Sequence, residues 1–259
     1  MRATEPQRHG DTEVLGRAIE VFARGFAFTR SRVYPCLAER VGKVWVVRDA
    51  ERSRKSGYRR EEFIACGTPP AEVDRLARQH TRGRFAVCAI LPAGEEDGAL
   101  RAGYKALGYR LGFTEPLMVH RLKGIPRCVS PAEVVRVNNT ELAARLAKAK
   151  KHRGKPLEAK YFGADSPLRQ YAAIVDGKIV GWVRSVVVGD WTWCADMHVA
   201  PPYRRRGIAR GMLCQMLADD RKKGSTLAVL LASHTGAKLY PVVGYEEVGM
   251  LYLFTPGKK

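Results

Sequence analysis

The sequence predicts an α/β protein of the α+β type, in which a mixed, mostly antiparallel sheet is flanked by helices and occurs in two tandem copies. One observation is a hairpin signal in the C-terminal half, where residues 170–175 and 179–188 flank the turn dipeptide Asp176-Gly177. A second is the change of apolar period within residues 191–217, from that of a buried strand to that of an amphipathic helix. Together they predict antiparallel strands that lead into a helix.

A repeat extends this prediction to the N-terminal half. The pattern Tyr-x-x-x-Gly-Tyr begins at Tyr104 and again at Tyr240, 136 residues further along the chain. An apolar, strand-like run precedes each copy of the pattern, and another follows it. We therefore expect a degenerate domain at residues 1–122, a linker at 123–131 and a second, complete domain at 132–259.

The C-terminal half contains a signal for each element of such a domain. Asn138 or Thr140 is expected to cap a helix, because both side chains accept hydrogen bonds from a first helical turn, and Gly224 is expected to end a later helix. In chain order the expected elements are strand 132–137, helix 141–151, the hairpin, strand 191–199, a helix from 207, strand 226–232, a short helix at 236–243 and a last strand from 244.

The N-terminal half contains a weaker version of the same order. Its expected elements are helix 13–26, strands 44–47 and 62–65, a helix opened by Thr68-Pro69-Pro70, strand 85–91 and strand 117–122. Proline is common in the first turn of a helix, but it lacks the backbone N–H group that a bound phosphate needs. We therefore expect this half to serve in packing, or to line one side of a substrate cleft.

The composition limits the partners of the chain. Its net charge of +19 is spread over both halves and favours anionic partners. High solubility alone is one explanation of this charge, and an acidic macromolecule or tRNA is another. No apolar run is long enough to cross a membrane, and no signal-type segment follows the basic N-terminus. We therefore expect a cytoplasmic protein without a membrane partner.

The cysteines give no sign of a metal site. The six of them are not spaced as metal ligands, so no structural zinc and no other metal is expected. Three lie in apolar, strand-like runs, namely Cys66, Cys88 and Cys194. We expect buried free thiols at these positions.

A phosphate site is predicted where the strand 191–199 passes into the following helix. The first turn of a helix exposes unpaired N–H groups and the positive end of the helix dipole. Gly207 removes the side chain that would block a close approach. Positive charge comes from four neighbouring residues, Arg204, Arg205, Arg206 and Arg210. These features favour a bound phosphate or pyrophosphate.

Two motifs at this end of the chain resemble those of the GNAT superfamily of acetyl-CoA-dependent N-acyltransferases. They are Arg204-x-x-Gly207-x-Ala209 and Leu239-Tyr240-x-x-x-Gly244-Tyr245. The preceding Asp196-x-x-Val199-x-Pro201-x-Tyr203 is similar to the central strand of that family. The resemblance covers residues 172–254. It implies a tandem GNAT protein with acetyl-CoA as co-substrate, in which a primary amine attacks the thioester directly in a ternary complex.

The resemblance also implies roles for individual residues. Tyr240 matches the tyrosine that donates a proton to the departing CoA sulfur, and a phenol with a pKa of about 10 is suited to this role. A backbone N–H group of residues 197–199 is expected to stabilise the oxyanion, which is typically worth about 3–4 kcal/mol. The residues expected to bind the co-substrate are Met197, His198, Val199, Arg204, Arg205, Arg206, Gly207, Ile208, Ala209 and Arg210.

The general base is left open by the sequence. Asp196 and His198 alternate along the strand and are expected on one face of it, together with Cys194. His198 titrates near neutral pH and is a candidate base, whereas Asp196 is expected instead to orient or neutralise the cationic amine. A water chain and a purely structural histidine are the alternatives. Nucleophilic catalysis by Cys194 is excluded, because four residues of strand span about 13 Å.

Two other functions compete with the enzyme. The first is a catalytically silent acyl-CoA-binding or regulatory module, and the second is a nucleic-acid-binding protein or a GNAT enzyme that acts on a tRNA-linked amine. The presence of Tyr240 beside an intact phosphate motif favours the enzyme. The expected acceptor is a small-molecule or peptide amine whose identity the sequence leaves open, as it does the oligomeric state.

Overall fold

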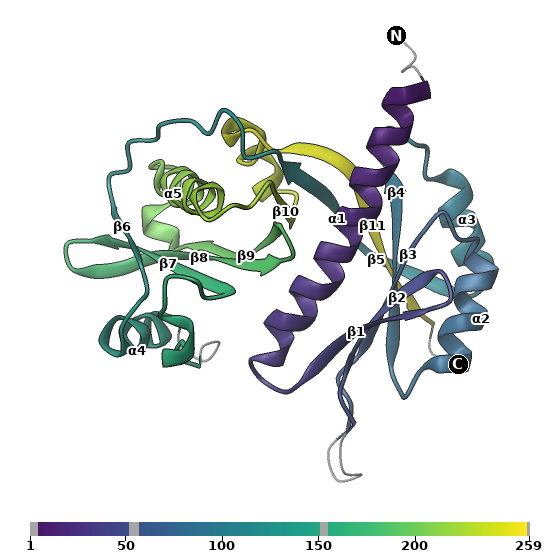
Figure 1. Ribbon diagram of the computed structural model, residues 1–259. Helices are drawn as coiled ribbons and strands as arrows, with labels where there is room; N and C mark the ends of the chain where they lie inside the picture. The colour runs from purple at the N-terminus through teal and green to yellow at the C-terminus, as the bar shows by residue number, and fades with distance from the viewer. Residues whose placement is uncertain (1–4, 52–56, 151–154, 258–259) are drawn as a thin grey trace. The chain divides into compact units, whose positions relative to one another are not determined.

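The computed structural model describes residues 5–51, 57–150 and 155–257 of the chain (Figure 1). The chain divides into two compact units. Unit 1 combines Met1–Met118 with Leu231–Ala237 and Glu247–Lys259, and unit 2 combines Val119–Leu230 with Lys238–Glu246. Among the described residues, no helix is both long enough and apolar enough to cross a membrane.

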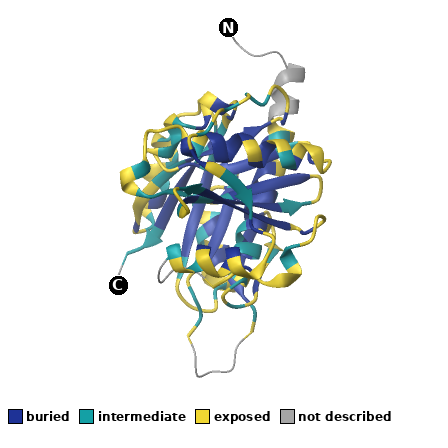
Figure 2. Cartoon of the chain, turned by 90° about the vertical axis from the view of Figure 1, so that its left-hand side faces the viewer, coloured by how far each residue is buried: buried dark blue, intermediate teal, exposed yellow. Residues whose placement is uncertain are grey.

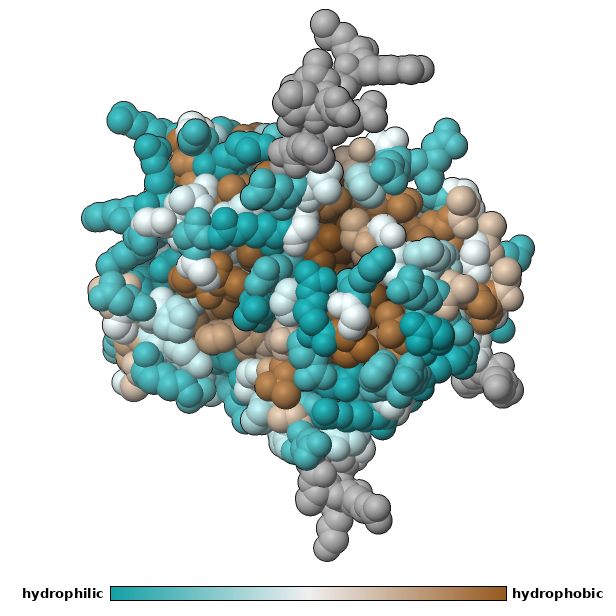
Figure 3. Space-filling view, turned by 45° about the vertical axis from the view of Figure 1, so that its right-hand side comes forward, coloured by the Kyte–Doolittle hydropathy of each residue, from teal (hydrophilic) through white to brown (hydrophobic). Residues whose placement is uncertain are grey.

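Buried residues follow the strands, and exposed residues lie mainly on helices and loops (Figure 2). The face shown in Figure 3 is covered mostly by hydrophilic residues, with smaller hydrophobic areas between them. This distribution is what a sheet covered by amphipathic helices produces, because each helix turns one apolar stripe towards the sheet.

Unit 1 contains three helices and six strands among its described residues. The helices are α1 (Glu5–Ser31), α2 (Pro70–His80) and α3 (Gly98–Ala106), and the strands are β1 (Cys36–Val41), β2 (Val44–Asp49), β3 (Glu61–Cys66), β4 (Phe85–Pro92), β5 (Tyr109–His120) and β11 (Glu246–Pro256). The strand order is β1-β2-β3-β4-β11-β5. Strands β1, β2 and β3 pair antiparallel, β3 and β4 pair parallel across α2, and β4 and β11 pair antiparallel.

The core of unit 1 uses the last strand of the chain. Tyr104 is fully buried, and its ring stacks on that of Phe254 in β11, with centroids 4.3 Å apart. Tyr252 and Tyr109 belong to the same buried cluster. Strand β11 is therefore a core element of unit 1, although it follows the residues of unit 2 in the chain.

Unit 2 contains two α-helices and five strands among its described residues. They are α4 (Thr140–Ala149), α5 (Ile208–Lys222), β6 (Glu133–Arg136), β7 (Leu168–Val175), β8 (Lys178–Val188), β9 (Trp191–Val199) and β10 (Leu227–Leu231). The strand order is β10-β9-β8-β7-β6. Strands β6 to β9 pair antiparallel, and β9 pairs parallel with β10 across α5. Short 3-10 helices lie at Ala159–Tyr161 (η2), Pro201–Tyr203 (η3), Gly236–Lys238 (η4) and Pro241–Val243 (η5).

The order of elements repeats between the units. In both, an antiparallel pair of strands is followed by a helix and then by a strand parallel to the second of the pair. The predicted α+β fold is thus observed in both halves. The compact units differ from the expected domain boundaries of 1–122 and 132–259, because β11 pairs with β4 and therefore groups with unit 1.

Several predicted elements are confirmed, and others are corrected. The hairpin is confirmed, because Asp176 and Gly177 have φ angles of 47° and 72°, as a tight two-residue turn requires. Asn138 and Thr140, the alternatives predicted as N-cap of the helix at 141–151, were wrong: Asn139 is the cap, and its side chain accepts a hydrogen bond from the backbone N–H of Leu142 at 2.8 Å. The helix expected at 236–243 is replaced by η4 and η5, which leave Tyr240 between them.

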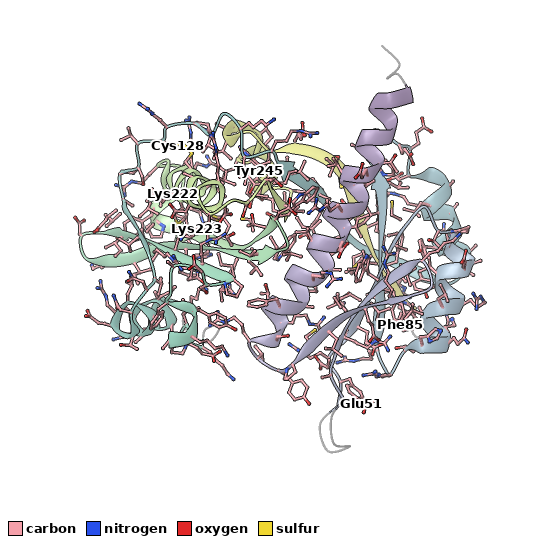
Figure 4. All side chains as sticks on the ribbon, in the orientation of Figure 1. Glu51, Phe85, Cys128, Lys222, Lys223 and Tyr245 are labelled. Carbon is pink, nitrogen blue, oxygen red and sulfur yellow. A yellow bond between two sulfur atoms is a disulfide. The ribbon has the colours of Figure 1, made fainter. Side chains whose placement is uncertain are left out.

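A disulfide joins the linker to α5. Cys128 and Cys214 are bonded, and Figure 4 shows Cys128 beside α5. The backbone also comes close here, because a Cβ atom at Gly211 would lie 2.5 Å from Cβ of Ser130. The three cysteines predicted as buried free thiols are free, as is Cys36; Cys88 and Cys194 are buried, whereas Cys66 is half-buried.

Candidate active site

Strand β9 contains a β-bulge at Asp196 and Met197. Trp182 of β8 lies opposite His198, and Arg184 lies opposite Ala195. One residue of β8 therefore lies opposite two residues of β9, which defines a bulge. Asp196 has a φ of 59°, in the left-handed region that few residues other than glycine adopt. A bulge leaves a residue of the ladder unpaired and bends the strand, and bulges are common beside active sites. We therefore treat this segment as part of a candidate active site.

The bulge overlaps residues 197–199, the segment in which the oxyanion donor was predicted. Strand β10 pairs with residues Trp191 to Trp193 of β9, at the beginning of that strand. The second half of β9, which includes Met197 and Val199, extends beyond this parallel pairing. This part of β9 is therefore not held to β10 by that parallel pairing.

The bulge also changes which face of the sheet the side chains after it point to. Side chains directly opposite each other in a sheet share a face, and residues three apart on one strand lie on opposite faces. His198 is paired with Trp182 and Cys194 with Ser185, so His198 and Cys194 lie on opposite faces. The expectation that Cys194 shares a face with His198 was therefore wrong, because the extra residue shifts the alternation.

The Cys194 thiol has no properties of a nucleophile. It is buried, and burial raises its pKa, with the charge of Asp220 acting in the same direction. A protonated thiol is not nucleophilic. This agrees with the exclusion of covalent catalysis from the sequence.

Asp196 is held between two cations. Lys150 Nζ and Arg184 Nη2 both donate hydrogen bonds to Asp196 Oδ2. Burial raises the pKa of Asp196, but the charges of Arg184 and Lys150 outweigh this effect and hold the pKa below its usual value. The carboxylate is ionised at neutral pH and already paired, so this geometry favours an anion that fixes the bulge over a proton acceptor.

His198 forms a stack beside this anion. Its ring lies 4.3 Å from the ring of Trp182, at an interplanar angle of 19°. Lys150 Nζ lies 5.4 Å from the centroid of Trp182, within the range of a cation–π interaction. Asp196 and His198 therefore lie in one cluster with Lys150, Arg184 and Trp182, and the stack fixes the plane of the His198 ring.

Helix α5 begins with uncapped N–H groups. Gly207 is its N-cap, has a φ of 81° and makes no side-chain capping bond. The backbone N–H of Gly211 donates to Gly207 O at 2.9 Å, so the N–H groups of Ile208, Ala209 and Arg210 precede the first helical bond. A Cβ atom at Gly207 would meet no atom within 4 Å. The space in front of this helix start is open, as an anion site requires.

The four predicted arginines are exposed but differ in their contacts. Arg204 Nε donates to Val199 O at 2.9 Å and so ties the start of α5 to the end of β9. The guanidinium of Arg206 lies 5.6 Å from the centroid of the Tyr203 ring. Arg205 has a φ of 59°, and with Gly207 it forms the sharp turn before the helix. Together with Arg210 these residues surround the uncapped helix start with positive charge.

A buried network fixes α5 on the sheet. Asp220 accepts hydrogen bonds from Arg169 Nη2 at 2.7 Å, Ser185 Oγ at 2.7 Å and Thr192 Oγ1 at 3.0 Å. The partners come from β7, β8 and β9, so one carboxylate connects the helix to three strands. This network sets where the start of α5 lies relative to the bulge in β9.

Tyr240 lies on a tight turn between η4 and η5. Its carbonyl oxygen accepts from the N–H groups of Val243 and Tyr245, both at 3.1 Å. Its ring packs against that of Tyr245, with centroids 5.6 Å apart and an interplanar angle of 69°. The side chain is buried, so its place is fixed by packing.

Several residues of the cluster were not predicted. Lys150, Trp182 and Arg184 are brought to Asp196 and His198 by α4 and β8, and nothing in the spacing of the sequence links them. The pairing of β8 with β9 was the usable signal, because the turn between these two strands places residues 182–184 opposite residues 195–198. Among the described residues, no group of histidine, cysteine and carboxylate side chains is arranged to hold a metal ion.

Comparison with known proteins agrees with this architecture. A sequence family described as the acetyltransferase (GNAT) domain matches residues 167–247. A search of the curated proteins gave no match. The matched residues span β7 to the turn that carries Tyr240, so they include both the bulge and the start of α5.

Solved structures match the whole chain. A GCN5-related N-acetyltransferase from Kribbella flavida is 16% identical, has a TM-score of 0.62, and the match covers 93% of this chain and 96% of that one. A GCN5-related N-acetyltransferase-like protein from Streptococcus suis is 12% identical, with a TM-score of 0.56 and coverages of 95% and 98%. A tandem GNAT protein from the clavulanic acid biosynthesis pathway is 14% identical, with a TM-score of 0.54 and coverages of 96% and 97%.

These matches confirm the fold predicted from the repeated motif and the hairpin. Residues 167–247 match the GNAT acetyltransferase domain, and the chain has the fold of tandem GNAT proteins.

Proposed function

We propose that the protein is an N-acetyltransferase that moves an acetyl group from acetyl-CoA to a primary amine by direct attack in a ternary complex. The observation that carries the proposal is the start of α5, an uncapped, glycine-opened and arginine-surrounded helix terminus at the end of a bulged strand. The acceptor is a small-molecule or peptide amine, and the compartment is the cytoplasm.

The start of α5 fits the pyrophosphate of acetyl-CoA. Three N–H groups point out of the helix, Gly207 leaves the approach open, and Arg204, Arg205, Arg206 and Arg210 supply charge. Phosphate groups bind well at such a terminus, because the N–H groups and the helix dipole favour negative charge. The thioester of acetyl-CoA is the donor of the acetyl group in this proposal.

The bulge in β9 supports the assignment of the oxyanion donor. A backbone N–H near Met197, His198 or Val199 is held by the strand and does not need to reorganise when the carbonyl oxygen gains charge. Asp196, which is fixed by Lys150 and Arg184, maintains the left-handed turn that this geometry needs. In this proposal Asp196 acts on the backbone, and not as the base.

Tyr240 is the proposed general acid, and its hydroxyl donates the proton that the CoA thiolate takes up as it leaves. The amine proton leaves through His198 or through water; the ring of His198 has a fixed plane in its stack with Trp182, which favours a directed acceptor. The proton balance then closes, with one proton taken from the amine and one given to the sulfur.

The proposal is tested by calorimetry and turnover. We expect one acetyl-CoA site per chain, and we expect Gly207→Glu to weaken acetyl-CoA binding at least about tenfold, because it places a carboxylate at the phosphate site. Gly207→Ala is the control, since it imposes the same backbone strain at a φ of 81° without a charge.

Turnover with a panel of a polyamine, an aminoglycoside and a peptide amine separates an enzyme from a silent acyl-CoA-binding module. Release of free CoA thiol that depends on the added amine would support the enzyme. Binding without turnover on any amine would favour the silent module, and equal losses of affinity in Gly207→Glu and Gly207→Ala would remove the phosphate assignment.

A further inference from the structure

His120 is buried, and both of its ring nitrogens are engaged. The backbone N–H of Leu122 donates to Nδ1 at 2.8 Å, and Nε2 lies 2.9 Å from the carbonyl oxygen of Val243. A carbonyl oxygen only accepts and a backbone N–H only donates, so the ring is neutral and carries its proton on Nε2. The side chain is 1% exposed, so no water competes for these bonds.

The turn that carries Tyr240 is built around this ring. Gly244 has a φ of 100°, and a Cβ atom there would lie 2.8 Å from His120 Nε2. The ring of Tyr245 meets the imidazole edge-on, with centroids 5.2 Å apart. Three consecutive residues, Val243, Gly244 and Tyr245, are therefore fitted to His120 by a hydrogen bond, by the lack of a side chain and by ring packing.

The same turn holds Tyr240 on its other side. The N–H groups of Val243 and Tyr245 both donate to the carbonyl oxygen of Tyr240, and the rings of Tyr240 and Tyr245 are packed together (Tyr245 is labelled in Figure 4). A movement of Val243 or Tyr245 is therefore transmitted to Tyr240 by two hydrogen bonds and one ring contact.

We propose that neutral His120 is a positioning residue for Tyr240, and that protonation of His120 releases the turn and misplaces the Tyr240 hydroxyl. The proposal rests on the proposed function, in which Tyr240 is the general acid. Protonation of Nδ1 turns the acceptor of the Leu122 N–H into a donor, so two donors then repel each other in a buried site; this repulsion displaces the charged ring and breaks its Nε2 bond to Val243 as well.

The charges around His120 set the direction of its titration. Burial lowers the pKa of His120, and the bond to Val243 and the charge of Glu246 oppose this only in part. Glu246 is paired with Arg121 at 2.9 Å, and Tyr245 is the other titratable group in contact with the ring. Because the pKa of His120 in the folded protein lies below the ordinary histidine value, the order of the turn is present at neutral pH and is lost only as the pH falls past that lowered pKa.

Two amide variants separate the two bonds. The side chain of His120→Gln places an N–H donor near the position of Nε2, and that of His120→Asn places an acceptor near the position of Nδ1. We expect His120→Asn, which loses the bond to the turn, to lower kcat about 10- to 100-fold. His120→Gln keeps that bond, and we expect a loss of less than about threefold. The acetyl-CoA Kd should stay within about twofold in both variants, because the start of α5 is untouched.

Amide exchange gives a readout that does not depend on catalysis. In His120→Asn the amides of Val243 and Tyr245 should exchange faster than in His120→Gln. In the unmodified protein, the protection factors of these amides should fall over the pH range in which the ¹⁵N chemical shifts of His120 report its protonation. Protection factors that stay unchanged through this titration would overturn the proposal, even if a variant failed to fold.

A double-mutant cycle distinguishes this proposal from the function on which it rests. If Tyr240 is the acid, His120→Asn should have little further effect on kcat in a Tyr240→Phe background. An undiminished effect in that background would overturn the positioning role. If instead Tyr240→Phe alone kept full activity, the acid of the proposed function would be wrong, while exchange that followed His120 would still establish the coupling.

Discussion

Two helices hold the same place in the repeated order of elements, but only one of them begins with open, uncapped N–H groups. Helix α5 starts at Gly207, without a cap and with open space before it. Helix α2 starts at Pro69 and Pro70, which have no N–H groups to offer. A Cβ atom at Gly103 in α3 would lie 2.8 Å from Pro70 Cγ, so α3 already occupies the approach to α2.

The two copies of Tyr-x-x-x-Gly-Tyr differ in the same way. Tyr104 is a core residue of unit 1, stacked on Phe254 and packed 5.4 Å from Tyr109. Gly108 and Gly244 both have a positive φ, so in both copies the motif ends a helical turn and begins a strand. The motif is therefore an element of the fold first, and the chemistry proposed for Tyr240 is an addition in one copy.

The largest expected effect comes from exchanging the two tyrosines for phenylalanine. Tyr240→Phe should lower kcat about 100- to 10,000-fold while acetyl-CoA binding changes little, because the hydroxyl acts mainly as the thiolate leaves. Tyr104→Phe should leave kcat near that of the unmodified protein. Steady-state kinetics of both variants test this, and equal losses would contradict the division between an active and a degenerate copy.

The disulfide provides a second contrast between the units. The described cysteines of unit 1 are free, whereas Cys128 and Cys214 of unit 2 close a loop with a sequence separation of 86. A loop of this length stabilises the folded state by up to about 4–5 kcal/mol in the chain-entropy model. Because disulfides are rare in the reducing cytoplasm, the state of this pair also bears on the proposed compartment.

We expect reduction of the disulfide to lower the free energy of unfolding of unit 2 and to leave unit 1 unchanged. Urea unfolding followed by amide exchange in each unit measures this. The Cys128→Ser/Cys214→Ser variant serves as control, since a reductant should not affect it further. A loss that is equal in the two units would show that they unfold together.

A matched pair of glycines tests the helix starts. Gly67, before α2, has a φ of 65°, and a Cβ atom there, like one at Gly207, would meet no atom within 4 Å. Gly67→Glu therefore imposes a similar strain and the same charge as Gly207→Glu. We expect at least about a tenfold loss of acetyl-CoA affinity for Gly207→Glu and none for Gly67→Glu, measured by calorimetry. Similar losses would mean that the effect is not local to α5.

Local signals in the sequence predicted the parts of the structure that depend on neighbouring residues. The hairpin at Asp176-Gly177 and the glycine start of α5 follow from turn chemistry and apolar period, and both are observed. The bulge was not predicted, because the alternation of residues along β9 does not indicate that the backbone of Asp196 adopts the left-handed region. Its absence from the prediction placed Cys194 on the wrong face.

Features that depend on contacts between residues far apart in the sequence were not predicted. The pairing of β11 with β4 could not be predicted, because the apolar pattern of a strand does not determine which other strand it pairs with. The disulfide between Cys128 and Cys214 could not be predicted for a similar reason, because the spacing of cysteines in a sequence does not determine which of them pair. Lys150 reaches Asp196 only through the packing of α4, so its role needed the three-dimensional structure.

The smallest expected effect compares two fully buried tyrosines, one in each unit. Tyr171 Oη donates to Asp219 Oδ2 at 2.9 Å, whereas Tyr104 Oη is buried without a hydrogen-bond partner in the described part of the chain. Burial raises the pKa of both phenols, so both are protonated at neutral pH. Tyr171→Phe removes a bond to a carboxylate and should cost about 1.5–3 kcal/mol of unfolding free energy.

Tyr104→Phe, by contrast, removes a buried hydroxyl that lacks a partner in the described part of the chain, and keeps the ring that stacks on Phe254. Because desolvating an unpaired hydroxyl is unfavourable, its removal should leave the free energy of unfolding unchanged or raise it by up to about 1–2 kcal/mol. Urea unfolding of the two variants measures the difference. A clear loss of stability in Tyr104→Phe would mean that its hydroxyl has a bonding partner in solution, and that unit 1 keeps a polar site around Tyr104.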